Sequence, residues 1–146
     1  MRLHASCAAA PHGDGTDALL LLGPSGAGKS DLLLRLIERG FTLVADDQVI
    51  IEHGQASPPA SLAGLLEVRG LGLFRLPYRA PARLRLAIEL TPTPAPRLPE
   101  PRQHEALGLP LISLDAHHPA ATARAALALE AACGRVANLS GAFTNG

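Results

Sequence analysis

The feature that most constrains this chain is the stretch GPSGAGKS at residues 23–30, which matches the pattern G-x-x-x-x-G-K-[ST]. The apolar run Ala18–Leu22 comes directly before it and is typical of a buried parallel strand. Asp31–Arg39 follows with apolar residues at helical spacing, and Gly40 is a suitable stop for a helix. The sequence therefore predicts a strand, a glycine-rich loop and a helix in succession, as in an α/β fold.

The same loop predicts a phosphate-binding site. Glycines permit positive φ and bring backbone N–H groups close to phosphate oxygens, and the start of a helix favours an anion. Lys29 can reach the β- and γ-phosphates of a nucleotide, and the Ser30 hydroxyl can ligate Mg²⁺. Lys29 is also the one lysine among 13 basic residues, and arginine is not a neutral replacement for it here. The predicted nucleotide-binding residues are Gly23, Pro24, Ser25, Gly26, Ala27, Gly28, Lys29 and Ser30.

An ordinary glycine turn between a strand and a helix is the alternative interpretation of this loop. The strand before it and the helix after it are the context that the phosphate-binding motif requires, and they favour the site.

Composition sets limits on the rest of the molecule. A chain of 146 residues suits one domain, and with only 3% aromatic residues its core must be built from Leu, Ala, Val and Ile. The formal net charge is zero, so nothing global points to nucleic acid. Residues 67–102 carry seven Arg and three Glu, a local excess that either receives an anionic partner or forms a solvated face.

Cysteine usage and hydropathy favour a cytoplasmic protein. Cys7 and Cys133 lie far apart, so a disulfide framework is not implied and free thiols are expected. Residues 1–10 do not form a signal peptide, and no apolar run approaches the roughly 18 residues that span a membrane.

Other elements follow from periodicity and from proline. We expect the helix Pro119–Ala137 from its alanine content, although ALALE within it could form a strand. Five prolines among the eleven residues Thr91–Pro101 exclude regular structure and predict an extended surface loop, either functional or a mere connection. The further expected strands are Leu3–Ala9, Phe41–Ala45, Arg83–Leu90 and Leu109–Leu114. Gln48–Glu52 could continue the strand Phe41–Ala45.

Two segments carry acidic groups that could serve phosphate chemistry. Asp46 and Asp47 follow an apolar run, and one of them can face the phosphates because successive strand residues point to opposite faces. The residues alone do not decide which, and an acidic pair in a surface turn is the alternative. In LLEVRGLG, residues 65–72, Glu67 and Arg69 share a face if the segment is extended, although an ordinary Glu–Arg pair beside a glycine bend would also explain it.

The run GPSGAGKSDLLLRLIERGFTLVADDQV, followed by LLEVRGLG, resembles the catalytic domain of bacterial HPr kinase/phosphorylase. The resemblance implies an α/β P-loop kinase domain similar to that of phosphoenolpyruvate carboxykinase and not a conventional Rossmann sheet. It implies a Mg²⁺- and ATP-dependent kinase that phosphorylates a serine of HPr, the phosphocarrier protein of the sugar phosphotransferase system, or a paralogue. It also implies a homo-hexamer. From charge and hydropathy we expect neither nucleic acid nor membrane as a partner.

Site residues follow from the resemblance position by position. Lys29 matches the phosphate-binding lysine and Ser30 the Mg²⁺-binding hydroxyl, and Glu67 matches the second Mg²⁺ ligand. Asp47 matches the acceptor of the seryl proton, with Asp46 in support. Two further catalytic residues are implied: a histidine ahead of the P-loop, His4, and an arginine that assists catalysis, Arg97.

The chain also departs from the family pattern. We expect a single catalytic domain over residues 1–146 that lacks the family's N-terminal domain, as in short alphaproteobacterial forms. The basic residues tied to phosphorolysis are not evident near Pro110–Arg124, where His117 and His118 stand instead, so kinase activity is better supported than phosphorolysis. A small-molecule kinase or carboxykinase relative, and a non-catalytic nucleotide sensor, are the alternatives.

Overall fold

The computed structural model describes residues 1–144, which form a mixed β-sheet, a separate hairpin and helices. The α-helices are α1 (Lys29–Glu38) and α2 (Ala121–Ala132), and a short 3₁₀ turn spans Ala60–Leu62. The strands are β1 (Arg2–Leu3), β2 (Ser6–Ala9), β3 (Asp17–Leu22), β4 (Thr42–Ala45), β5 (Val49–Glu52), β6 (Gln55–Ser57), β7 (Leu65–Val68), β8 (Gly72–Arg75), β9 (Ala82–Leu90) and β10 (Leu111–Leu114).

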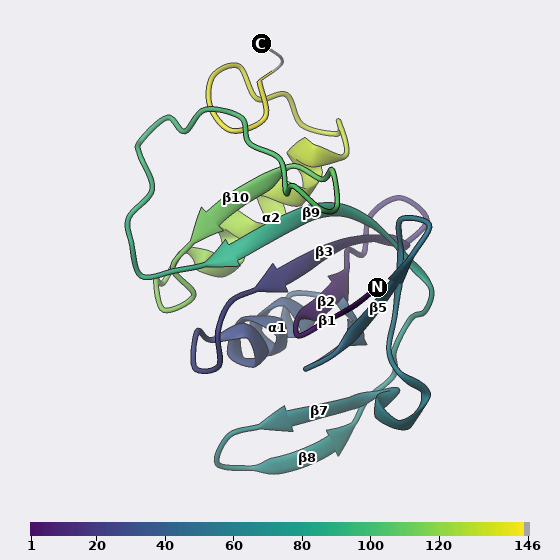
Figure 1. Cartoon of the computed structure of the whole chain (residues 1–146). Helices are drawn as coiled ribbons and strands as arrows, with labels where there is room; N and C mark the ends of the chain where they lie inside the picture. Colours follow the sequence, from purple (N-terminus) through teal and green to yellow (C-terminus); the bar gives the residue numbers. More distant parts are fainter. Residues whose placement is uncertain (145–146) are drawn as a thin grey trace.

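The main sheet has eight strands in the order β1-β5-β6-β9-β3-β2-β4, with β10 also paired to β9. The central strand β3 runs parallel to β9 on one side and antiparallel to β2 on the other. The long strand β9 pairs with β6 near its start and with β10 over its second half. The β7–β8 hairpin forms its own two-stranded sheet and stands apart at the bottom of the view in Figure 1.

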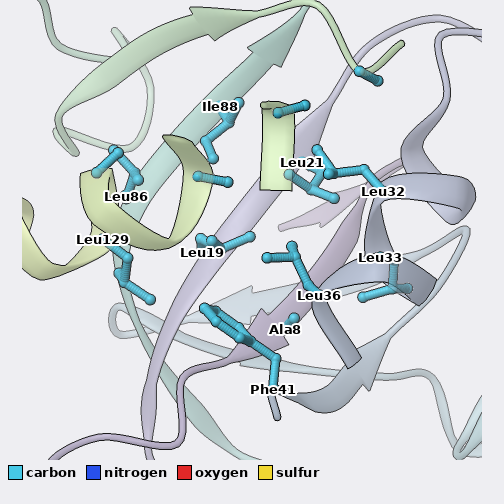
Figure 2. Close-up of a cluster of buried hydrophobic side chains, with 14 of the residues drawn as sticks. Ala8, Leu19, Leu21, Leu32, Leu33, Leu36, Phe41, Leu86, Ile88 and Leu129 are labelled. Carbon is cyan, nitrogen blue, oxygen red and sulfur yellow. The ribbon is translucent and has the colours of Figure 1, made fainter. Parts of the chain in front are cut away.

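One face of the sheet packs against both helices. Leu19 and Leu21 of β3 point to this face, where they meet Leu32 and Leu36 of α1 and Leu129 of α2 (Figure 2). These side chains are fully buried, which satisfies the expectation of an aliphatic core. Because the last two residues of the motif at 23–30 already belong to α1, the burial of this helix fixes the loop at the carboxyl end of β3.

The other face of β3 is also buried. Ala18 and Leu20 share a second cluster with Val44 of β4 and Val49 of β5, strands that lie far apart in the sheet order. The sheet is therefore curved, so that its outer strands approach each other over this face. Burial on both faces explains why the sequence Ala18–Leu22 is continuously apolar.

The expected single strand Leu3–Ala9 is wrong, because the chain breaks at His4 and Ala5. Before the break β1 pairs with β5, and after it β2 pairs with β3 and β4. The amide of Ala5 donates to the carbonyl of Asp47 at 3.2 Å, so the break is held by the acidic pair. It leaves His4 exposed beside that pair instead of within a strand.

The possible continuation of Phe41–Ala45 through Gln48–Glu52 is also wrong. A bend at Asp46 and Asp47 separates β4 from β5, and Asp47 has a φ of 71°. The amide of Gln48 donates to the carbonyl of Asp46 at 2.8 Å, which closes the bend. The two strands consequently occupy different places in the sheet.

The remaining predicted elements are confirmed within a few residues. Arg83–Leu90 forms β9, Leu109–Leu114 contains β10, and the alanine-rich segment forms α2 and not a strand at ALALE. Thr91–Pro101 contains neither helix nor strand. Across residues 1–144, every helix falls short of the length and apolar character that crossing a membrane requires.

Candidate functional site

A cleft of about 630 Å³ opens at the carboxyl end of β3. The P-loop (residues 23–30), the bend after β4, the β7–β8 hairpin and the loop between β10 and α2 all contribute to it. The residues that line it are His4, Ser6, Ser25, Gly26, Gly28, Lys29, Ser30, Asp31, Leu34, Asp46, Asp47, Glu67, Val68, Arg69 and His117.

The P-loop presents unpaired backbone donors to this cleft. A turn closed by the amide of Ala27 and the carbonyl of Pro24, at 3.1 Å, begins the loop, and Gly28 caps α1 with a φ of 95°. Within residues 1–144, the amides of Gly26, Gly28, Lys29 and Ser30 donate to no acceptor. Because free N–H groups at the start of a helix favour an anion, this donor set fits a phosphate group.

The side chain of Lys29 folds back against the backbone of the P-loop. Its side chain is buried, and Nζ donates to the carbonyls of Gly23 at 2.5 Å and Pro24 at 3.1 Å. Burial lowers the pKa of Lys29, while the negative charges of Asp46 and Asp47 oppose the shift. The ammonium is therefore held at the floor of the cleft, with its charge incompletely compensated.

The two neighbouring aspartates have different environments. Asp46 is buried and accepts hydrogen bonds from the Ser6 hydroxyl at 2.7 Å and from the Ser30 hydroxyl at 2.9 Å. The Asp47 side chain is 61% exposed, and its Oδ1 lies 3.2 Å from Nδ1 of His4. Asp46 thus ties β2 to α1, and Asp47 remains accessible to a molecule that enters the cleft.

Oxygen ligands for a metal are present but not assembled. Ser30, Asp46, Asp47 and Glu67 all line the cleft. Among the residues that the structure describes, His, Cys, Asp and Glu side chains form no group of three close enough to hold a metal. This donor set fits Mg²⁺, which binds proteins through one or two carboxylate or hydroxyl oxygens and completes its shell with water and phosphate.

The structure brings most of the predicted site residues together. His4, Lys29, Ser30, Asp47 and Glu67 line one cleft. Of the remaining P-loop positions, Ser25, Gly26 and Gly28 also line it, while Gly23, Pro24 and Ala27 shape the loop behind it. Arg97 is exposed on the proline-rich loop and does not line this cleft.

Sequence reasoning missed Ser6 and His117 as cleft residues. Ser6 is a fully buried hydroxyl in a strand of small apolar residues, and such an isolated polar residue could have signalled a buried partner. His117 reaches the cleft because the loop after β10 passes over the P-loop. That approach depends on tertiary structure, so no local pattern could have revealed it.

Comparisons with known proteins bear on the family and the fold of this chain. The family model described as the HPr serine kinase C-terminal domain matches residues 15–78, which contain the P-loop, the acidic pair and LLEVRGLG. The chain is similar to a solved structure, the Hpr(Ser) kinase/phosphatase from Coxiella burnetii, with a TM-score of 0.68 and 26% identity. That match covers 92% of this chain and 94% of the other, and it confirms the predicted fold class.

Curated relatives extend the match in sequence. The HPr kinase/phosphorylase of Burkholderia cenocepacia (strain HI2424) is 40% identical over 135 residues, which cover 76% of this chain and 42% of the relative. The HPr kinase/phosphorylase of Aromatoleum aromaticum is 40% identical over 114 residues, which cover 64% of this chain and 36% of the relative. The chain therefore spans less than half the length of these curated relatives.

Proposed function

Since the chain belongs to the HPr serine kinase C-terminal domain family, we propose that it transfers the γ-phosphoryl group of ATP to a serine hydroxyl of HPr or of a related phosphocarrier protein. ATP is the phosphoryl donor in this proposal and Mg²⁺ the metal that the reaction requires. The reaction would take place in the cleft between the P-loop and the β7–β8 hairpin.

The observation that carries this proposal is the difference in exposure between Asp46, which is buried, and Asp47, which is exposed. A kinase for an alcohol needs a carboxylate that can reach the incoming hydroxyl, and Asp47 is exposed within the cleft. Asp46 is occupied by the Ser6 and Ser30 hydroxyls, so it organises the site and is not free to accept a proton. A surface turn with two inert aspartates would not bury one of them against the P-loop helix.

Each residue has a role that follows from its place. The free amides of the P-loop and the Lys29 ammonium would bind the phosphate oxygens and balance their charge. Asp47 would accept the proton of the seryl hydroxyl, and the contact with His4 would hold its carboxylate in position. Bound Mg²⁺, held by Ser30 and Glu67, would supply positive charge to the transferring phosphoryl group.

We do not propose phosphorolysis for this chain. The loop Asp115–His118 presents His117 to the cleft and contains neither Lys nor Arg. Attack of inorganic phosphate would bring a further anion to the phosphoserine, and this loop offers no lysine or arginine to balance its charge.

We also propose that the acting unit is a hexamer in the cytoplasm, where ATP is available. Leu71 and Leu73, at the tip of the β7–β8 hairpin, are 75% and 66% exposed, so burial against another protein would be favourable. Arg97, which lies away from the cleft of its own chain, keeps its predicted role only if it reaches the cleft of a neighbouring copy. Light scattering of the purified protein measures the oligomeric state, and a monomer that is fully active would contradict both statements.

The acceptor assay tests the proposed function. The purified protein is incubated with labelled ATP, Mg²⁺ and HPr, and in parallel with a panel of small alcohols and acids, and mass spectrometry locates any modified serine. Lys29→Ala should abolish transfer and greatly weaken nucleotide binding, whereas Asp47→Asn should abolish transfer and leave nucleotide binding nearly intact. Transfer to a small acceptor only, or ATP binding without transfer to anything, would replace a protein kinase with a small-molecule kinase or a nucleotide sensor.

A further inference from the structure

The imidazole of His117 lies close to Gly28 of the P-loop. A Cβ atom built on Gly28 would lie 3.6 Å from Cε1 and 3.9 Å from Nε2 of His117. His117 also lines the cleft together with Gly26, Gly28 and Lys29. The edge of the ring that carries Nε2 therefore faces the residues that present free amides.

The loop that carries His117 is fixed against the P-loop and α1. Ala116 is buried, and a Cβ atom added to Gly28 would lie 2.8 Å from the Cβ of Ala116. The backbones of Gly28 and Ala116 are therefore in close contact. Arg35 of α1 donates to the carbonyl of Ala116. The amide of His117 donates to the Asp115 carboxylate at 2.9 Å, which closes a turn at this point. The backbone at His117 is thus held in place from both sides.

The side chain of His117 is exposed, and its ring nitrogens are available for hydrogen bonds. Within residues 1–144 neither ring nitrogen is in a hydrogen bond or an ion pair, in contrast to His118, whose Nδ1 accepts from the amide of Ala120 at 2.9 Å. The backbone contact positions His117 at the cleft while its ring remains free to donate. A ring N–H at this place can add one donor to those of the P-loop.

We propose that His117 is a nucleotide-binding residue that donates a ring N–H to the phosphate groups held by the P-loop. This inference rests on the nucleotide site of the proposed function and adds to it a residue from another segment, more than eighty positions further along the chain. The role requires a donor and not a particular charge state, because neutral and protonated imidazole both carry an N–H. The phosphates, not the base, are assigned as its partner because Gly28 lies within the loop whose amides face the anion.

The experiment compares three variants with the wild-type chain by titration calorimetry. His117→Ala removes the ring, His117→Phe keeps an aromatic ring of similar size without a donor, and His118→Ala is the matched control on the adjacent exposed residue. The probes are ATP, inorganic pyrophosphate and adenosine, each with Mg²⁺. We expect both His117 variants to bind ATP and pyrophosphate about fivefold to tenfold more weakly, as loss of one charge-assisted hydrogen bond predicts, with His118→Ala unchanged.

The outcomes separate the possible failures. Unchanged binding of pyrophosphate to His117→Ala, or full affinity in His117→Phe, would overturn the inference, because packing and not donation would then explain the position of the ring. A loss confined to adenosine would also overturn it, since that result would place His117 against the base. The wild-type chain could fail to phosphorylate any acceptor while the His117 variants still bind pyrophosphate more weakly than it does. That pair of results would support the inference about His117 and contradict the proposed kinase activity.

Discussion

The hydroxyl of Ser30 donates to both carboxylate oxygens of Asp46, at 2.9 and 3.1 Å. Ser30 lies in the first turn of α1, and Asp46 lies directly after β4, so this pair connects the P-loop helix to the bend that carries the proposed base. Ser6 of β2 donates to the same carboxylate from within the sheet. The position of Asp47 is therefore set by its buried neighbour and by two hydroxyl groups.

This arrangement predicts that substitution of Asp46, but not of Asp47, lowers the stability of the fold. Asp46→Asn should lower the free energy of unfolding by about 1–3 kcal/mol, because the Ser6 and Ser30 hydroxyls would donate to a neutral amide oxygen instead of a buried carboxylate. Asp47→Asn is the matched control and should leave stability nearly unchanged, because that side chain is exposed. Urea denaturation of the two variants measures the difference. Equal stability of both would show that the hydroxyl contacts of Asp46 contribute little.

A further variant, Ser6→Ala, separates stability from proton transfer. It removes one donor to Asp46 and touches neither Lys29 nor Asp47. We expect a loss of about 1 kcal/mol in stability, with kcat for transfer reduced less than in Asp47→Asn. Denaturation and the acceptor assay together provide the comparison. A loss of activity as large as that of Asp47→Asn would mean that Ser6 itself takes part in the reaction.

The strand, P-loop and helix could be predicted from sequence because each depends on local features. A continuous apolar run, glycines at fixed spacing and a helical period are all visible within residues 18–40, and α1 follows from them. A turn at Asp46 and Asp47 was only an alternative in the sequence, and its geometry was not predicted. It depends on the positive φ of Asp47 and on the amide of Ala5, which belongs to a segment forty residues away.

The sequence predicted most of the residues that belong to the candidate site but not how they are arranged in space. The resemblance named His4, Asp47 and Glu67, and the fold places all three at one cleft. The residues alone left open which aspartate faces the ligand, because strand alternation stops applying where the strand ends. Burial of Asp46 by Ser6 and Ser30 distinguishes them, and those contacts come from three different elements.

Close contact at Gly28 predicts that this position does not tolerate a side chain. Gly28 has a φ of 95°, and an added Cβ would meet Ala116 at 2.8 Å, so Gly28→Ala should displace the loop after β10 and weaken nucleotide binding. Gly26→Ala is the control, because Gly26 also has positive φ but no atom within 4 Å of an added Cβ. Thermal unfolding and ATP titration should show the larger loss for Gly28→Ala. The reverse order would mean that backbone strain outweighs the contact.

The two cysteines are both free, and because Cys7 is buried and Cys133 half-buried, both should react slowly with thiol reagents. Complete burial raises the pKa of Cys7 far above its ordinary value, and burial also raises the pKa of Cys133. Because the thiolate is the reactive form, the folded protein at pH 8 should react slowly at Cys133 and still more slowly at Cys7. Dithionitrobenzoate absorbance before and after addition of guanidinium checks this. Rapid release equal to two thiols without denaturant would contradict the buried position of Cys7.

The ion cluster around Asp17 predicts how stability depends on pH. The Asp17 side chain is 8% exposed and lies 2.9 Å from Arg135 and 3.2 Å from Arg85. Burial alone would raise the pKa of Asp17, but the hydrogen bond from Arg135 and the nearby arginine charges outweigh it, and the pKa is lowered. Since the folded pKa lies below the unfolded one, this group stabilises the fold above the unfolded pKa of about 3.9 and ceases to do so as the pH falls through the folded value.

Asp17→Asn should therefore lower the free energy of unfolding by about 2–4 kcal/mol at neutral pH, because three arginines would lose their shared carboxylate. The difference from the wild type should shrink as the pH is lowered below about 4, where Asp17 of the unfolded wild-type chain begins to take up a proton, and it should be smallest below the folded pKa. Asp14→Asn is the control, since Asp14 also contacts Arg83 but is exposed, so the change in stability should be much smaller than for Asp17→Asn. Urea denaturation from pH 3 to pH 7 provides the measurement. A difference between wild type and Asp17→Asn that stayed constant over this range would show that packing, and not charge, gives Asp17 its effect.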